Sequence, residues 1–366
     1  MEEVLILKEP AYSGSIWCGN LTSGLVGELK QKRITYKIID SLNEIKAFHK
    51  YSFIIGSDNE WVRSVLTECG EMGIYPILLC NQISRKFDVN YSTVCSDIAG
   101  SMKHLVEILE SAGKERIALY GVNPQSVSDE GRKDSFLAAR GLTEERDIYQ
   151  NGSSLENCFD SFLPRAEEYD VVICTNDFAA ISLVRHLEKR RQDILDKILI
   201  IGCAEARLTE SYAKRILSVR LNFEEYGRAA VAILNNVKRN PFISSIVIMI
   251  KWDCPTLQDI SPKQEGRMNS RKEYVSAEGT DTFYSDSELW EMMLVECLLC
   301  QCKDVDDQII KKIMEGQSYE TIAEQCFLTE SSIKYRVKRM EKICRVKGRR
   351  QLSALLCRYL QRDSQP

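Results

Sequence analysis

The stretch "DIAGSMKHLVEILESAGKERIALYG", residues 97–121, joins the two patterns that decide the fold of most of this chain. Its first part, 97–112, carries apolar residues at helical spacing, which predicts an amphipathic helix. Its last part, 116–121, is a short apolar run of the kind that forms a buried strand. A buried strand that follows such a helix is typical of a parallel sheet with helices on both faces.

The same alternation extends from residue 4 to about residue 253. Further apolar, β-branched runs lie at 4–7, 34–39, 53–57, 75–80, 171–175, 198–203, 216–221 and 244–250. Amphipathic helices are predicted between most of these runs, for example at 177–190. Because the predicted strands are too many for one sheet, we expect an α/β fold with two parallel-sheet lobes. Lobes of this kind bind small molecules at the C-terminal ends of their strands.

The length of 366 residues suggests two or three domains, and 44% hydrophobic with 28% charged residues is typical of a soluble globular protein. No apolar run approaches the ~20 residues of a membrane-spanning helix, and the N-terminus lacks the pattern of a signal peptide. We therefore expect a cytoplasmic protein that does not bind membranes. In that compartment the 14 cysteines are expected to be reduced thiols. The group Cys297, Cys300 and Cys302 lacks a nearby fourth ligand, so we expect no metal and no cofactor.

A polar stretch at 261–286 contains Gly and Pro and has no sustained apolar period, which predicts a linker. It separates a predicted α/β part at 1–260 from a C-terminal part. Because the linker is poor in apolar residues, we expect the two parts to fold independently. Asp286 or Ser287 is predicted to begin a connecting helix at 287–302. The apolar stripe of this helix indicates core packing, and a contact between protomers is the alternative.

The last segment, 303–366, is predicted to form a small all-α helix-turn-helix domain. Its four helical pieces are expected at 305–314, 318–325, 330–343 and 349–361. The stretch "IAEQCFLTESSI" predicts a sharp corner, since Ala323 lets two helices cross closely and Thr329 can cap the next helix. Such a corner presents the helix after it to the DNA major groove. The alternative is a structural corner that binds no DNA.

Basic residues are concentrated in this segment, although the whole chain has a net charge of −4. Residues 331–362 contain eleven Lys and Arg side chains and one acidic residue, Glu341. Segregation of charge on this scale indicates an electrostatic footprint for DNA phosphates. A solvated charged surface is the alternative.

The segment 303–362 resembles the DNA-binding domain of the LuxR (FixJ/NarL) family. The residues that carry the resemblance are Gly316, Ile322, Ala323, Thr329, Ser332, Ile333, Lys334, Ile343 and Arg349. Thr321 and Cys326 depart from the Glu and Leu that the family usually has. The resemblance implies that base edges face Lys334, Tyr335 and Lys338. It implies phosphate contacts for Thr329, Ser331, Arg336 or Arg339, and we expect one for Arg349 also. A related corner occurs in sigma factors.

The stretch 97–121, followed by "SVSDEGRKDSFLAAR" at 126–140, is similar to the sensor domain of the LacI/GalR family. Other matching pieces are "WCGNLTSGL" (17–25), "FIIGSDN" (53–59), "ICTNDFAA" (173–180), "LIIGC" (199–203) and "SVRLNFEEYGRAAVAIL" (218–234). The resemblance covers about 1–260 and implies the two-lobed periplasmic-binding-protein type I fold. It also implies a small effector in the cleft between the lobes, bound by Trp17, Arg132, Asn176 and Asp177.

Each of these predicted ligand contacts has a structural alternative. Trp17 can stack on a ring or can be a core aromatic, and Asp177 can simply cap the helix that follows it. The rigid fork of Arg132 suits polar ligand oxygens, but it can instead pair with Asp129 or Glu130. Where the family usually has an Asp that grips sugar hydroxyls, this chain has Ala204. We therefore expect a site that is more permissive to a neutral or acidic ligand than a sugar-binding relative. Of these we favour a ligand that bears a carboxylate or phosphate, which Arg132 can bind in bidentate fashion.

The two resemblances together predict a ligand-responsive transcriptional regulator that binds double-stranded DNA. We expect a homodimer, because paired half-sites add base contacts, and the helix at 349–361 is a candidate contact. A solute-binding receptor for transport is one alternative, but a signal peptide is missing and the tail is basic. An α/β enzyme is another, but the sequence has no phosphate loop, GxSxG or HExxH motif.

Overall fold

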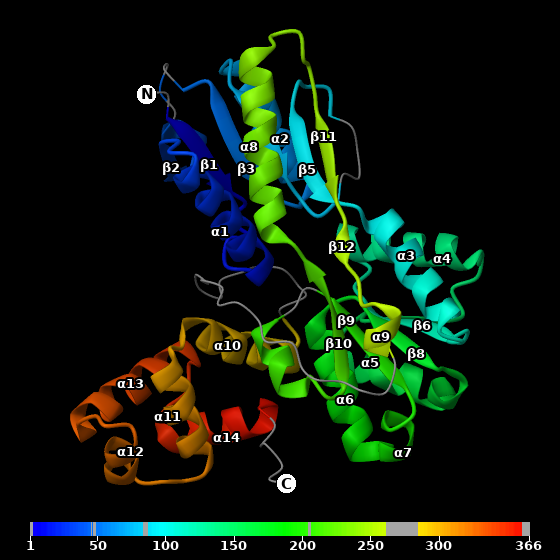
Figure 1. Cartoon of the computed structure of the whole chain (residues 1–366), viewed down its shortest axis with the longest axis vertical. Coiled ribbons are helices and arrows are strands. Elements are labelled where there is room, and N and C mark those ends of the chain that lie inside the picture. Colours follow the sequence, from blue (N-terminus) through cyan, green and yellow to red (C-terminus); the bar gives the residue numbers. More distant parts are fainter. Residues whose placement is uncertain are drawn as a thin grey trace.

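The computed structural model of the chain describes residues 3–44, 46, 49–82, 87–203, 206–260 and 285–360. It consists of two α/β lobes and a helical domain that lies beside the second lobe (Figure 1). Residues 261–284 of the predicted linker at 261–286, Ala204 and residues 361–366 lie outside the described residues, so the predictions for them are not tested.

Lobe 1 contains a six-stranded sheet in the order β11-β5-β4-β3-β1-β2, and all of its pairs are parallel. Its elements are β1 (Val4–Lys8), α1 (Ile16–Gln31), β2 (Tyr36–Ile39), η1 (Leu42–Glu44), β3 (Tyr51–Ile55), α2 (Asn59–Glu71), β4 (Tyr75–Leu79), β5 (Ser92–Ser96), α8 (Phe223–Arg239) and β11 (Val247–Ile250). Ile6 belongs to the core formed with α1 and α8, whereas its neighbour Leu5 belongs to the core formed with α2. Strands β1, β3 and β4 are mostly apolar because both faces of the sheet are covered.

Lobe 2 contains a second six-stranded sheet in the order β12-β10-β9-β8-β6-β7. It is parallel except for the short antiparallel pair of β10 and β12. Its elements are α3 (Ile98–Ser111), β6 (Ile117–Val122), α4 (Val127–Arg140), β7 (Ile148–Gln150), α5 (Leu155–Phe162), η2 (Leu163–Glu168), β8 (Val171–Cys174), α6 (Asp177–Arg190), α7 (Gln192–Leu195), β9 (Leu199–Cys203), η3 (Arg207–Tyr212), β10 (Ile216–Leu221), β12 (Trp252–Asp253) and α9 (Leu257–Ile260).

The chain crosses between the lobes three times, after β5, after β10 and after β11 (Figure 1). The third crossing ends in β12, the edge strand of the second sheet. The predicted α/β fold with two parallel-sheet lobes is confirmed. The carboxyl ends of both sheets therefore meet where the chain crosses, and this is where ligands bind in such sheets.

Two glycines let α1 and α8 touch backbone to backbone in lobe 1. A Cβ atom added to Gly24 would overlap the carbonyl oxygen of Phe223, and one added to Gly227 would overlap the carbonyl oxygen of Gly24. A side chain at either position would therefore force the two helices apart. The third glycine of this region, Gly27, has no atom within 4 Å of such a Cβ.

We expect Gly24→Ala to lower the free energy of unfolding by about 1–3 kcal/mol, the usual cost of overpacking a closely fitted core. Gly27→Ala in the same helix is the matched control, and it should raise stability by up to about 1 kcal/mol because alanine favours the helix. Urea denaturation of the full-length chain measures both changes. Equal effects of the two substitutions would contradict the backbone contact.

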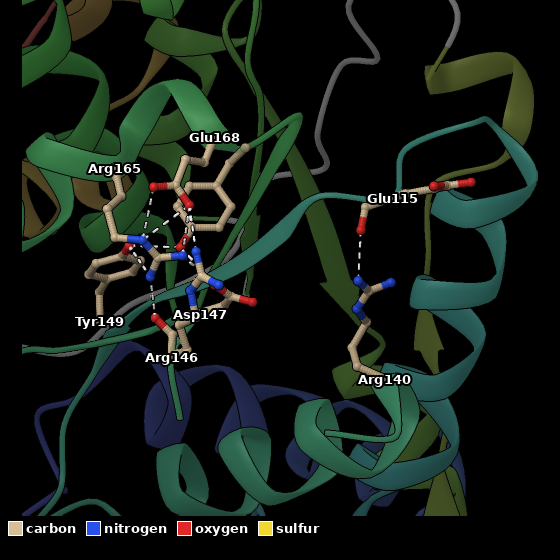
Figure 2. A network of polar contacts seen from close by, with 8 residues as sticks. Glu115, Arg140, Arg146, Asp147, Tyr149, Arg165 and Glu168 are labelled. Atoms are coloured by element: carbon tan, nitrogen blue, oxygen red, sulfur yellow. Dashed lines mark hydrogen bonds and ion pairs between the residues drawn. The ribbon is translucent and has the colours of Figure 1, made fainter. Parts of the chain in front are cut away.

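A network of polar contacts holds the three-residue strand β7 at the far edge of lobe 2. Figure 2 shows Arg165 at its centre, donating to the carbonyl oxygen of Arg146 (2.6 Å), to Asp147 (2.9 Å) and to Glu168 (2.9 Å). The guanidinium also lies over the ring of Tyr169 at 5.4 Å. Arg165 therefore joins η2 to the residues that come just before β7.

The helical domain comprises α10 (Ser287–Gln301), α11 (Asp304–Met314), α12 (Tyr319–Gln325), α13 (Glu330–Ile343) and α14 (Arg349–Tyr359). The predicted helices are all present, and Asp286 caps α10 as expected. One hydrophobic core runs from lobe 2 through α10 into this domain; its members include Leu208 and Tyr212 of lobe 2, Met292 and Val295 of α10, and Ile310 and Leu356 beyond. This shared core runs against the expectation that the two parts fold independently.

The apolar stripe of α14 is buried within the same chain. Leu352 and Leu356 are fully buried, and Tyr359 accepts a hydrogen bond at its carbonyl oxygen from the Tyr212 hydroxyl of lobe 2 (2.8 Å). The helix at 349–361 was a candidate for a contact between protomers, but its apolar stripe packs against the rest of the same chain.

Candidate functional site

A cavity of about 230 Å³ lies between the two lobes and is walled by both of them and by α10. All four residues predicted to bind a ligand line it: Trp17, Arg132, Asn176 and Asp177. Its other polar lining residues include Ser15, Asn20, Ser57, Asp58, Asn81, Asn123, Gln125, Ser126, Ser128, Asp129 and Thr175. Its apolar lining includes Ile16, Phe178, Leu221, Phe223 and Met293. An apolar wall with convergent polar groups is the usual composition of a small-molecule site.

Trp17 is the second residue of α1, and its ring packs against the core of lobe 1. Its indole nitrogen is buried and has no hydrogen-bond partner among the described residues. Trp17 therefore packs against the core, as its structural alternative predicted, and it also lines the cavity. A buried donor on a cavity wall is costly unless something accepts its hydrogen bond, so this N–H is available to a ligand.

Arg132 lies on α4 and is 8% exposed. Its Nη1 donates to the carboxylate of Asp129 at 2.8 Å, and its guanidinium lies 5.9 Å from the ring centre of Trp252. The ion pair that was the alternative for Arg132 thus exists, and Arg132 lines the cavity as well. Burial raises the pKa of Asp129, against the opposing charge of Arg132. The Nε of Arg132 has no partner in the described part of the chain and can still donate to a ligand.

Asn176 and Asp177 follow β8, but their side chains have different roles. Asn176 caps α6 by accepting a hydrogen bond from the backbone N–H of Ala179 (2.9 Å). The suggestion that Asp177 is the cap is therefore wrong. The buried Asp177 carboxylate instead accepts from the Ala206 N–H (2.6 Å) and from the hydroxyls of Thr209 (2.8 Å) and Ser218 (2.8 Å). It holds the ends of β9, η3 and β10 together at the floor of the cavity.

The charges on the cavity wall disfavour the acidic ligand that was expected. Asp58, Asp129 and Asp177 contribute three carboxylates, while Arg132 contributes one guanidinium that is already paired. A ligand carboxylate or phosphate would meet repulsion from these groups. Most of the remaining polar lining consists of amides and hydroxyls, which suit a neutral polar molecule.

The sequence contained a signal for several lining residues that were missed. Asp58, Asn81 and Asn123 follow the ends of β3, β4 and β6, and in parallel sheets such positions face the ligand. Met293 had no such signal, because nothing local distinguishes it from the other apolar residues of α10.

Comparisons with solved structures agree with the two-lobed fold. No protein-family model and no curated protein matches the sequence. The transcriptional regulator CelR in complex with cellobiose is 14% identical, with a TM-score of 0.55 over 69% of this chain and 82% of that chain. The LacI family transcriptional regulator CCPA from Weissella paramesenteroides with bound sucrose is 17% identical, with a TM-score of 0.54 over 70% and 97%. An ABC transporter periplasmic solute-binding protein from Actinobacillus succinogenes with bound D-allose is 17% identical, with a TM-score of 0.54 over 71% and 99%.

The two lobes have the periplasmic-binding-protein type I fold. We refer to them together as the type I sensor. The similar proteins are regulators and a solute-binding protein rather than enzymes. Within the part of the chain that the structure describes, no helix is long and apolar enough to cross a membrane.

Beside the type I sensor, α13 exposes the residues predicted to face DNA bases. Thr329 caps this helix as expected, accepting from the Ser332 N–H (3.2 Å). Ser331, Lys334, Tyr335 and Lys338 are exposed, while the buried side of the helix consists of Ile333, Val337 and Met340. Lys334 makes an exposed ion pair with Glu330 on the same helix (2.7 Å), and its Nζ lies 5.9 Å from the ring centre of Tyr319. The exposed ion pair can be exchanged for DNA.

The predicted phosphate contacts in the helical domain include three arginines with intramolecular partners. Arg336 donates to the buried Asp306 (2.6 Å), and Arg339 donates to the carbonyl oxygen of Gln301 (3.1 Å). Arg349 donates to the carbonyl oxygen of Gln317 and lies over the ring of Tyr319 at 4.7 Å. These arginines hold the helices together, so removing one would alter folding as well as any contact with phosphate.

Proposed function

We propose that this chain is a ligand-responsive, DNA-binding regulator of transcription. Its type I sensor would bind a small molecule between the lobes, and its LuxR-type helical domain would bind double-stranded DNA through α13. The observation that carries the proposal is the connection of a ligand-sized cleft, with buried unpaired donors, to an exposed basic helix in one packed molecule. Such a basic helix has no role in a transport receptor, and contact with chromosomal DNA requires a cytoplasmic location.

For the effector we propose a neutral, polyhydroxylated molecule such as a sugar. The cavity offers amide and hydroxyl groups for sugar hydroxyls and the ring of Trp17 for an apolar sugar face. Asp58 and Asp129 supply carboxylate acceptors, so the absence of a carboxylate at Ala204 does not remove this chemistry. Structurally similar sensors carry cellobiose, sucrose and D-allose.

A neutral effector at about 100 times its dissociation constant should stabilise the full-length chain by about 2.7 kcal/mol. Thermal unfolding with cellobiose, sucrose, D-allose and glucose measures the effect, and glucose 6-phosphate and gluconate are the charged comparisons. The neutral sugars should give the larger rise in melting temperature. A rise with the charged compounds alone would restore the acidic ligand and reject the sugar.

For DNA binding, we expect Lys334→Ala and Lys338→Ala each to weaken binding to a selected operator by about 1–3 kcal/mol. Lys342→Ala removes the same charge from the last turn of the same helix, so it should weaken specific and non-specific binding alike. Gel shifts with the operator and with scrambled DNA of equal length separate the two effects. Operator affinity that is unchanged in both Lys334→Ala and Lys338→Ala would reject α13 as the recognition helix.

The proposed regulator acts as a homodimer, because two helix-turn-helix units can then bind paired half-sites. Light scattering of the full-length chain at the concentration of the gel shifts tests this state. A monomer that still binds a palindromic operator with high affinity would argue against it.

A further inference from the structure

The helix α10 has two buried sides that belong to different clusters. Met292 and Val295 lie in the large core shared by lobe 2 and the helical domain. Met293 and Cys297, which are one turn apart, form a separate small cluster with Ile16 and Phe178, and Ile343 of α13 packs against it. Lobe 1, lobe 2 and the predicted recognition helix therefore meet at one point on α10.

Met293 lies on the wall of the interlobe cavity as well as in this cluster. It is 5% exposed, and it lines the cavity together with Ile16, Trp17 and Phe178. A methionine side chain is flexible and polarisable, so it can repack around ligands of different shape. A residue of the helical domain thus contributes to the site that the proposed function assigns to the effector.

Carboxylates on both ends of α10 fix the helix to lobe 2. Glu288 near the start accepts from the Ser182 hydroxyl (2.8 Å) and from Arg185 of α6. Glu296 near the end is 1% exposed and accepts from the backbone N–H groups of Arg207 (2.8 Å) and Leu208 (2.7 Å). Among the described residues of the Met293–Cys297 cluster, the contribution of lobe 1 is Ile16. Closure of lobe 1 onto lobe 2 would therefore press on α10 at Met293.

The helix α13 is attached to α10 along its C-terminal half. Ile343 packs on the Met293–Cys297 cluster, and the Cys344 thiol lies 4.0 Å from the carbonyl oxygen of Leu294. Arg339 donates to the carbonyl oxygen of Gln301. A displacement of α10 therefore carries α13 with it.

We propose that Met293 is an effector-contacting residue of the sensor site, and that α10 transmits effector binding from this contact to α13. The inference rests on the proposed function. It assigns to the Met293 side chain the link between effector binding in the cavity and DNA binding through α13. In this proposal α10 has two positions, and each has its own arrangement of Met293 against Ile16. An effector that packs better against one arrangement favours the corresponding position of α10. In this proposal the effect of effector binding reaches α13 through α10 and does not require the predicted linker.

The first test is titration calorimetry of the full-length chain with cellobiose, sucrose and D-allose. Met293→Ala is expected to raise the dissociation constant of the sugars that bind by about tenfold, or about 1.4 kcal/mol. Met314→Ala removes the same side chain from the core of the helical domain away from the cavity, and should change the dissociation constant by less than about twofold. Wild-type affinity in Met293→Ala, and also in Met293→Gln, would overturn the assignment.

The second test needs no effector and uses gel shifts with a selected operator. Ile16→Ala and Met293→Ala should each change operator affinity by about fivefold or more, since coupling between sites is usually of this size. The double variant should differ from the product of the single effects, because the two side chains act through one contact. Wild-type affinity in both single variants would overturn transmission through α10. Failure of the wild-type chain to bind any sugar or any DNA would instead reject the proposed function.

Discussion

Asp129→Ala is expected to lower the free energy of unfolding by about 3–5 kcal/mol, because it leaves the guanidinium of Arg132 buried without its carboxylate. Both side chains of this pair are 9% exposed, so water in the cavity can replace the lost partner only in part. Asp129→Asn, which keeps the shape and one acceptor, should lose less. Urea denaturation of the full-length chain at neutral pH measures these differences.

Glu107→Ala is the matched control for Asp129→Ala. Glu107 pairs with Lys103 at 3.9 Å, and their side chains are 57% and 70% exposed. Removing such an exposed pair should change the free energy of unfolding by at most about 0.5 kcal/mol. If Asp129→Ala costs no more than this control, the Asp129–Arg132 pair does not stabilise the sensor. Because Arg132 belongs to this pair, Arg132→Ala should also change the stability of the protein without ligand. Ligand binding by wild type and Arg132→Ala should therefore be compared under conditions in which the same fraction of each protein is folded.

Glu288→Ala is also expected to cost about 3–5 kcal/mol, since Arg185 of α6 has a side chain only 9% exposed and would lose its carboxylate. The stacking of Arg185 over the ring of Tyr359 at 4.3 Å offsets part of this loss. Because Glu288 fixes the start of α10 to lobe 2, the variant should also be cut faster by protease within the helical domain. Glu224→Ala, which breaks an exposed pair with Arg228, is the control and should leave both measurements nearly unchanged.

The contribution of Glu288 should depend on pH. Burial, the largest single influence, acts to raise its pKa, but the hydrogen bonds of His186 and Ser182 and the charge of Arg185 outweigh burial, so the pKa is lowered. Because the pKa of Glu288 is lower in the folded state, its contribution to stability is fully present above the pKa of the unfolded state, about 4.3. This contribution is lost as the pH falls through the pKa of the folded state. The difference in unfolding free energy between wild type and Glu288→Gln should therefore shrink below about pH 4.3. A constant difference between pH 6 and pH 3 would contradict the ion pair.

Most of the strands that the sequence predicted correctly have apolar runs buried on both sides; the predicted edge strands β2 and β11 are partly exposed. β5 was missed because three of its five residues are Ser or Thr. Ser92 and Ser96 are nevertheless buried, since their hydroxyls bond to Tyr75 and to Tyr226 and Trp252. These partners are distant in the sequence, so no local pattern could show that the hydroxyls are satisfied.

The cleft was predictable to the extent that its residues follow strand ends or match the quoted motifs, as Trp17 and Asn176 do. The pairing of Arg132 with Asp129 was foreseen only as an alternative, because spacing of three residues on a helix permits the pair without requiring it. The position of Met293 depends on how α10 docks on lobe 2. That docking is decided by Glu288, Glu296 and the shared core, which are tertiary contacts that the sequence does not display locally.

Lobe 1 cannot be completed until late in synthesis, because α8 and β11 reach its sheet and helices from residues 223–250. The strands of lobe 2 from β6 to β10 lie within 117–221 and can pair before that point. During translation β5 therefore presents an unpaired sheet edge, the kind of edge that associates with other chains. Chains released before β11 is made should aggregate through β5. Because the two partner strands of β5, β4 and β11, are far apart in the sequence, lobe 1 should fold more slowly than lobe 2.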